Sequence, residues 1–494
     1  MTRVLTMAVL LLGLSAVAQT ATLPATTPAT NAASKPAGKA RFTISKETTY
    51  FTEPLLEDGR VDYLRALNDQ AGKGVTKDNN FAVVMLEVMG PAAMGVDSQQ
   101  VADTLGVRLP KEGMDPSKVD IGEALKRPFT AKDLPAVAKW LQQNKKAIDT
   151  IVEGSKRARW FVPLEPGKVV LYKTTFGGVY AQIKSLAKVL GARASMAIGE
   201  RRYGDAWQDI QAIYRISALL AQDPTLLGQL VGLALPGLAD GAAQELATRA
   251  DLSADLAYKF ADEVAKAPAP PNLISALLAG RAEILHAIQW LATHDVAQWD
   301  AVLTTLGADL KEDAQEIHIL KKFHDSVDVD AVMKQVNKQF DVIAETMSIK
   351  NFQERQKQSE LLKSAAKNMS EDKLGDDPSP TEITAWAAVN AASVLVSLDP
   401  GKAQSIVDAA HVSRKLTELA FLLRAYKKEN GVFPDSLKDL VGKRLKEVPN
   451  DIDGKPIRYQ KTKTGCTLTS VGRDGKPDDK ITHNDLHVVM DDEK

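Results

Sequence analysis

The sequence predicts a mainly α protein of helical hairpins that ends in a small α+β domain. Ala and Leu dominate the 494-residue chain, and aromatic residues make up only 5% of it. Ala and Leu lose little conformational freedom in a helix, so this composition favours helices. Amphipathic segments at helical spacing recur along the chain, whereas short apolar runs bounded by turn residues near the C-terminus predict strands. One arrangement that such hairpins adopt is an irregular α-solenoid.

The first residues predict an export signal. Arg3 supplies a positive n-region, residues 4–14 form an apolar h-region, and Ala16-Val17-Ala18 has the small-x-small cleavage pattern. We therefore expect a signal peptide over residues 1–18 and a mature chain that begins at Gln19. The h-region is short for a membrane span and no other stretch is long enough, so no transmembrane segment is expected after cleavage. The predicted location is periplasmic or extracellular.

The net charge and the cysteine count bear on two questions: whether the protein binds nucleic acid and whether it forms a disulfide. The formal net charge is -1, which argues against nucleic acid as the main partner because phosphate binding needs a concentrated basic field. Cys466 is the only cysteine, so an internal disulfide is impossible. We expect Cys466 to be a small buried residue on a strand.

Composition also divides the chain into segments. Residues 19–40 are rich in Ala, Thr and Pro and predict a disordered spacer. A helical domain is expected over residues 41–268, and its helical continuation, after a Pro-Ala cluster, over 269–370. An acidic linker and a further helix, expected at 382–396, occupy residues 371–400, and the α+β domain covers residues 401–494.

Capping residues and prolines predict where several helices begin and end. Asn79 or Asn80 caps a helix that Gly90 ends, and another helix is expected over residues 134–152. Asp223 is the expected N-cap of a later helix, with Pro224 at its first position. The Pro236-Gly237 pair is expected to kink or split that helix.

One pair of amphipathic segments predicts a helical hairpin joined at residues 199–204. Apolar residues from Leu186 to Ile198 form one stripe, and those from Ala206 to Ile216 form the next. The spacing of Tyr203, Ala206 and Trp207 resembles the inter-helix turn of tetratricopeptide repeats. The resemblance covers a single hairpin, without recurrence at that family's period.

Sequence motifs for catalysis or simple metal binding are absent. The chain has no H-E-x-x-H pair, no G-x-S-x-G elbow and no phosphate loop. We assign no catalytic or cofactor-binding residue. The seven histidines lack the spacing of a shared metal site and are expected at the surface or the edge of the core: His286, His294, His318, His324, His411, His483 and His487.

The segment 416–479 has the most specific pattern. An amphipathic helix ends at Asn430-Gly431, where glycine accepts the left-handed conformation. Asp435 then follows a Phe-Pro turn and is expected to cap a short helix. Three strands are predicted next, over residues 457–461, 466–471 and 486–490.

Three motifs of this segment resemble the C-terminal globular part of the major pseudopilins of type II secretion. They read LAFLLRAYKKENGVFPDSLKDLV, DGKPIRY and TLTSVGRDGKPDD, in that order. Pseudopilins carry a helix ending Asn-Gly-x-Tyr/Phe-Pro, a Gly-x-Pro-x-x-Tyr strand and a Ser-Leu-Gly-x-Asp-Gly turn. The resemblance implies a helix packed on a small antiparallel sheet.

The same resemblance implies a calcium ion in the loop after the Gly-x-Asp-Gly turn. Asp474 matches the turn aspartate, and Asp478, Asp479 and Asp485 fall where further carboxylate ligands are expected. Calcium prefers six to eight oxygen ligands, which several carboxylates and main-chain carbonyls supply together. The alternative interpretation is a plain hairpin turn followed by a solvated acidic tail.

The remainder of the chain departs from the pseudopilin pattern, and we base the functional prediction on that difference. Pseudopilins begin with a long apolar helix that polymerises, whereas this chain has a cleavable signal and a long helical body, so the C-terminal unit is interpreted as a borrowed fold. We predict an exported, non-enzymatic protein whose helical body contacts other proteins in the periplasm or envelope. Two alternatives are an exported enzyme with a site assembled from scattered helical residues and an accessory component of a type II secretion-like apparatus.

Overall fold

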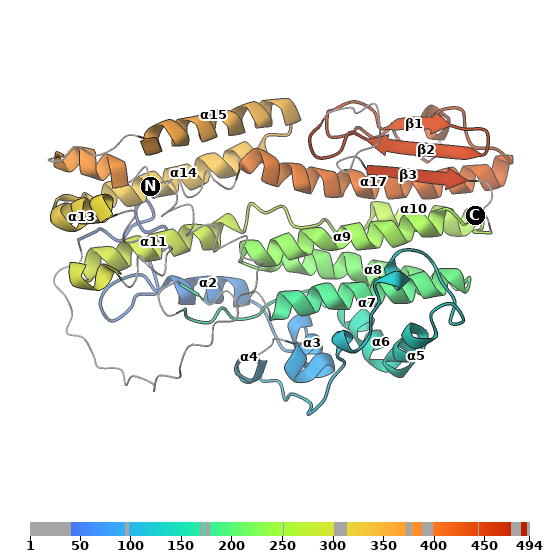
Figure 1. Cartoon of the computed structure of the whole chain (residues 1–494), viewed down its shortest axis with the longest axis horizontal. Coiled ribbons are helices and arrows are strands. Elements are labelled where there is room, and N and C mark those ends of the chain that lie inside the picture. The colour runs from blue at the N-terminus through green and yellow to red at the C-terminus, as the bar shows by residue number, and fades with distance from the viewer. Residues whose placement is uncertain are drawn as a thin grey trace.

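The structure, a computed structural model, confirms the coarse fold class. It is mainly helical, with a small antiparallel sheet near the C-terminus (Figure 1). The predicted signal peptide (1–18) and spacer (19–40) lie outside the described residues. The structure describes residues 41–93, 98–167, 171–172, 178–249, 251–300, 314–371, 378–387, 399–442, 444–475 and 486–491.

The helices of the described ranges fall into three groups along the chain. The first group is α2 (Tyr63–Gly72), α3 (Phe81–Met89), α4 (Ser98–Thr104), α5 (Pro135–Gln143) and α6 (Lys145–Gly154). The second is α7 (Val179–Gly199), α8 (Tyr203–Leu219), α9 (Leu226–Ala247) and α10 (Ala254–Ala265). The third is α11 (Leu277–Thr293), α13 (Ala314–Phe323), α14 (Val329–Ser348), α15 (Phe352–Glu371) and α17 (Pro400–Asn430). Of the helix predicted at 382–396, the structure describes residues 382–387, which are helical.

Local hydrogen bonds determine where helices of the first group begin and end. The predicted cap of α3 is confirmed, because the Asn80 side chain accepts a hydrogen bond from the Ala82 N–H and Gly90 ends the helix with a φ of 61°. The single helix predicted over 134–152 is wrong, since the chain breaks at Asn144 into α5 and α6. The Asn144 side-chain amide donates to the Trp140 carbonyl at 2.9 Å, and the Asn144 backbone N–H donates to the same carbonyl at 3.0 Å, so Asn144 closes the end of α5.

The start of α9 also differs from the prediction. Thr225, rather than Asp223, is the N-cap, and its hydroxyl accepts from the Gly228 N–H at 3.0 Å. Asp223 is instead buried, where its carboxylate accepts the Trp160 indole N–H at 2.9 Å. The other oxygen of the same carboxylate accepts the Thr225 N–H at 2.9 Å, so Asp223 combines a local turn contact with the tertiary contact to Trp160.

Pro236 does not split α9, which continues from Leu226 to Ala247. The helix packs against α7, α8 and α17, and this packing holds it together across the proline. Among the described residues α9 is the one helix long and apolar enough to cross a membrane, and 56% of its apolar window is buried inside the structure. Buried Asp240 on α9 accepts the Tyr214 hydroxyl at 2.5 Å. The apolar composition of α9 is consistent with its central position, where it packs against α7, α8 and α17.

Long helices form the centre of the molecule. Figure 1 shows α7, α8 and α9 side by side, with α17 running along them on the side away from α5 and α6. The predicted hairpin is confirmed as α7 and α8. Trp207 of α8 stacks on Phe260 of α10 at 4.5 Å, and Phe421 of α17 meets both rings edge-on at 5.6 Å. These aromatic contacts tie three helices into one apolar core.

The C-terminal sheet has the order β1-β2-β3, with antiparallel neighbours. The strands are β1 (Arg458–Lys461), β2 (Gly465–Ser470) and β3 (Leu486–Asp491), which confirms the three predicted strands. Leu468 pairs with Tyr459 on one side and Val488 on the other. Cys466 is buried on β2, as predicted. The short helix before the sheet (η8, Leu437–Leu440) is capped by Ser436 rather than Asp435, because Ser436 forms a capping box with Asp439.

Helix α17 belongs to both the body and the C-terminal unit. It contacts α14 and α15, then α9 and α10, and its last turns contact β2 and β3. The Arg424 guanidinium is buried and donates to the carbonyls of Ala247 at 2.9 Å and Thr248 at 2.6 Å, at the C-terminal end of α9. Those carbonyls lack a partner within α9, so Arg424 completes the hydrogen bonding of that helix end. One continuous apolar cluster extends from Phe81 to Met490.

Candidate functional site

A charged groove of about 1100 Å³ lies between α5–α6 and the α7–α8 hairpin. Its floor is apolar and includes Leu141, Val152 and Met196, while its walls carry Lys, Arg, Asp and Glu side chains. Sites for small molecules are usually apolar clefts of roughly 300–1,000 Å³. This groove is slightly larger than that range and more polar.

The hairpin brings the central charges together. The stripe from Leu186 to Ile198 buries one face of α7 and leaves Arg193 at its edge, half-buried. Asp209 projects from α8 at the same level and is 1% exposed. A buried carboxylate needs a cation or several donors, and Arg193 supplies both.

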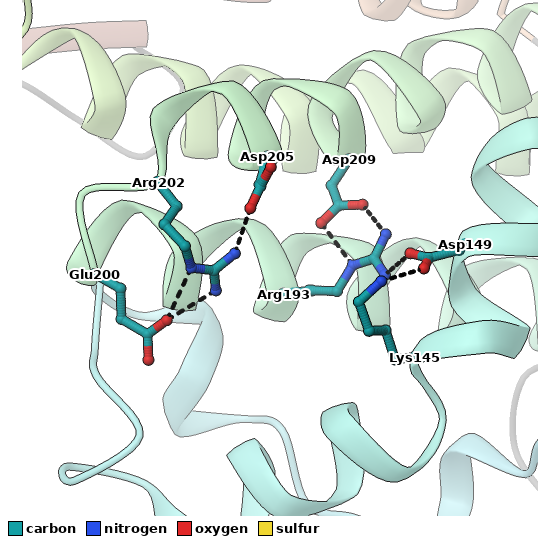
Figure 2. Close-up of polar contacts among 7 residues, drawn as sticks. All are labelled: Lys145, Asp149, Arg193, Glu200, Arg202, Asp205 and Asp209. Atoms are coloured by element: carbon teal, nitrogen blue, oxygen red, sulfur yellow. Dashed lines mark hydrogen bonds and ion pairs between the residues drawn. The ribbon is translucent and has the colours of Figure 1, made fainter.

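Arg193 joins three helices. Its Nε donates to Oδ2 of Asp209 at 2.9 Å and its Nη2 to Oδ1 at 2.6 Å, while Nη1 donates to Asp149 of α6 at 2.6 Å. Lys145 approaches the other oxygen of Asp149 at 2.6 Å. Figure 2 shows Arg193 between the two aspartates, with Lys145 beside it. The four side chains form one closed ion-pair cluster, which we call the central cluster.

The ionisation of the central cluster follows from its packing. Burial alone would lower the pKa of Arg193, but the hydrogen bonds and charges of Asp209 and Asp149 outweigh it and raise that pKa. Burial alone would raise the pKa of Asp149, and Lys145 and Arg193 instead hold it below its usual value. Arg193 and Asp149 therefore remain charged at neutral pH.

A second ion-pair cluster lies at the hairpin turn. Arg202 donates to Oε2 of Glu200 from Nε at 3.1 Å and from Nη2 at 2.8 Å, and its Nη1 donates to Asp205 at 2.6 Å. Figure 2 shows this cluster next to the central one. Its arginine is more exposed than Arg193, with 43% of the Arg202 side chain accessible against 16%. Its contribution to folding free energy is correspondingly small.

The far end of the groove holds Arg215 of α8. Its Nη2 donates to Oε1 of Gln211 at 2.9 Å, and no ion pair of Arg215 is found among the described residues. Burial lowers the pKa of Arg215, and the charges of Glu153 and Glu263 only partly oppose that effect. Both carboxylates have other donors, since Lys156 contacts Glu153 at 2.5 Å and the Gln211 amide donates to Glu263 at 2.7 Å.

The lining of the groove consists of charged, amide and apolar side chains. Of the described residues that line it, none is His, Cys, Ser or Thr. The lining carboxylates are hydrogen-bonded to cations: Asp149, Glu153, Glu200, Asp205 and Asp209. Burial raises the pKa of Asp209 despite the hydrogen bonds and charge of Arg193, whereas the pKa of Asp149 is held below its usual value.

The predicted calcium ligands lie elsewhere. Asp474 is exposed in the turn after β2, and Gly475 follows it with a φ of 65°. A Cβ on Gly475 would lie 2.3 Å from the Phe352 ring, so the turn packs closely on α15. The other three residues, Asp478, Asp479 and Asp485, fall outside the described residues. The described residues hold no group of three His, Cys, Asp or Glu suited to a metal, and the calcium site stays a prediction.

Sequence reasoning did not single out the groove residues. Arg193 follows Leu190 within an apolar stripe, and Asp209 directly precedes Ile210 in the next stripe. A charge of each sign inside facing apolar stripes of one predicted hairpin is the signal that would have indicated a buried ion pair. Asp149 is 44 residues from Arg193 and has no comparable signal.

Comparison with protein-family models, curated proteins and solved structures found no match.

Proposed function

We propose that this is an exported, non-enzymatic protein whose helical body binds an extended segment of another protein in the periplasm or envelope. The observation that supports this proposal is the groove between α5–α6 and α7–α8, which has an apolar floor and walls with charges of both signs. An extended peptide presents side chains and main-chain polar groups along its whole length. A groove lined by both apolar and charged side chains can contact both kinds of group.

The walls of the groove are already organised. Arg193 and Arg202 each contact two carboxylates, so their side chains lose little further freedom when a ligand arrives. Preorganised polar groups lower the entropic cost of association. The paired carboxylates also favour a binding role over the alternative of an exported enzyme with a site built from helical residues.

The proposal also covers the solenoid arrangement of the helical body, the pseudopilin-like fold of the C-terminal unit and the export of the protein. The helical body is an irregular solenoid of hairpins, and the C-terminal unit is a pseudopilin-like fold used for stability or contact. The order of α17, η8 and three antiparallel strands supports that relation. Export predicts that the protein recovered outside the cytoplasm begins at Gln19, which N-terminal sequencing checks.

The binding test uses a phage-displayed library of random peptides against the purified protein. We expect selected peptides to bind the unaltered protein and to lose binding when Ala138→Trp fills the groove. Ala138 is a half-buried lining residue of α5. The matched control is Ala234→Trp, which adds the same ring at an exposed position of α9 outside the lining.

Two results would contradict the proposal. One is a library that yields no peptide bound by the folded protein. The other is binding that Ala138→Trp and Ala234→Trp affect equally, because the peptides would then contact another surface. Circular dichroism melting of both variants checks that they retain the fold.

A further inference from the structure

The groove contains one half-buried cation, Arg215, that forms no ion pair among the described residues. Six lining residues are cationic, Lys139, Lys145, Lys156, Arg193, Arg202 and Arg215, and five are acidic, Asp149, Glu153, Glu200, Asp205 and Asp209. Arg193 and Arg202 have two carboxylates each, and the lysines Lys145 and Lys156 have one each. Arg215 and Lys139 have no ion pair among the described residues, and only Arg215 is half-buried, Lys139 being exposed.

Arg215 has hydrogen-bonding capacity to spare. A guanidinium has five N–H donors in a planar fork, and the one hydrogen bond found for Arg215 in the described part of the chain goes to Gln211. The charges of Glu153 and Glu263 act on Arg215 and offset only part of the cost of its burial, and neither carboxylate forms an ion pair with it in the described part of the chain. A carboxylate that arrives in the groove would restore both the charge balance and the missing hydrogen bonds.

The apolar contact point of the groove lies on the other side of the central cluster. Met196 is three residues from Arg193 toward the hairpin turn, and Arg215 is six residues from Asp209 away from the turn. Because Arg193 and Asp209 are level with each other, the helical rise separates Met196 from Arg215 by about 14 Å along the groove. An extended strand covers that distance with about four residues.

We infer that the segment bound in the groove is extended and carries a carboxylate and a bulky apolar side chain four residues apart. The carboxylate contacts Arg215, and the apolar side chain packs on Met196 and on Ala138, which also lines the groove. Residues four apart in a strand project to the same side, so both reach the groove together. The central cluster lies between them and faces the main chain of the segment. This inference rests on the proposed function and specifies the chemistry of its partner.

The test compares peptides selected on the unaltered protein with those selected on Arg215→Glu. The first set should be enriched in Asp or Glu four positions from a Leu, Ile, Met or Phe. The second should show Lys or Arg at the acidic position, because the charge of the contact is reversed. Arg215→Gln should weaken the acidic peptides by about 10- to 100-fold, the range for a lost charge-assisted hydrogen bond. Arg215→Lys should restore part of that loss.

Matched controls separate this inference from the proposed function. Lys188→Gln removes an exposed cation of α7 outside the lining and should leave the affinity unchanged. Peptides that Ala138→Trp displaces but that lack the acidic position, or that Arg215→Gln does not weaken, would overturn the inference and leave the binding function standing. A library without any binder would overturn the proposed function itself.

Discussion

Arg193 holds Asp209 through two parallel hydrogen bonds, Nε to Oδ2 at 2.9 Å and Nη2 to Oδ1 at 2.6 Å. This bidentate contact sets both the distance and the orientation of α7 relative to α8. The same guanidinium reaches Asp149, so α6 is held against the hairpin as well. The wall of the groove therefore depends on a single side chain that joins three helices.

We expect Asp209→Asn to lower the free energy of unfolding by about 3 kcal/mol, because one partner of a mostly buried ion pair is lost. Asp205→Asn, at the more exposed cluster, should lower it by less than about 1 kcal/mol. Urea denaturation of the two variants measures the difference. Equal effects would show that the central cluster is no stronger than a surface ion pair.

Stability should fall as pH rises from 6.5 to 8. Burial raises the pKa of Glu283 to about 8 from an ordinary 4.5, with a smaller opposing effect of its hydrogen bond with Tyr172. The folded state thus holds a proton that the unfolded chain releases above pH 4.5, and this advantage is lost as pH rises through 8. Burial lowers the pKa of His286 to about 4, so His286 has the opposite effect, but only below pH 6.5.

Over that window the expected loss is about 2 kcal/mol, from the proton linkage of Glu283. Glu283→Gln should remove the slope and leave the protein more stable than the unaltered chain at pH 8. Urea denaturation at several pH values between 6.5 and 8.5 tests this. The same slope in both proteins would mean that another group titrates there.

Arg424 should be required for docking of α17 on α9. Arg424→Met removes the donors to the carbonyls of Ala247 and Thr248 and should cost about 2 kcal/mol or more, because those buried carbonyls are left without partners. Arg458→Met, on the exposed edge strand β1, is the matched control and should cost little. Thermal unfolding of both variants gives the comparison, and similar melting temperatures would contradict the docking role.

The predicted calcium site is best measured on the whole protein, because α17 packs against α9 and α10 and would expose apolar surface in isolation. If Asp474, Asp478, Asp479 and Asp485 bind calcium, millimolar calcium should raise the melting temperature, since a ligand of the folded state stabilises that state. Asp474→Asn should reduce the shift, and magnesium should not reproduce it. Identical melting temperatures with calcium and with a chelator would show that the folded protein does not bind calcium at this site.

The sequence by itself determined the features that depend on neighbouring residues. The side chain of Asn80 caps α3, Gly431 ends α17 with a φ of 75°, and Cys466 lies buried on β2. Each follows from backbone hydrogen bonding or side-chain periodicity within a few positions. The helical body and the three strands were predictable for the same reason.

Only the tertiary structure decided the features that depend on distant partners. Thr225 caps α9 while the buried Asp223 before it accepts the distant Trp160 indole N–H, and Pro236 remains inside a helix that packs against α7, α8 and α17. In the groove Arg193 contacts Asp149, 44 residues away, and no local pattern encodes such a contact. Local rules set which elements form, while the burial of charge and apolar surface between elements sets where they meet.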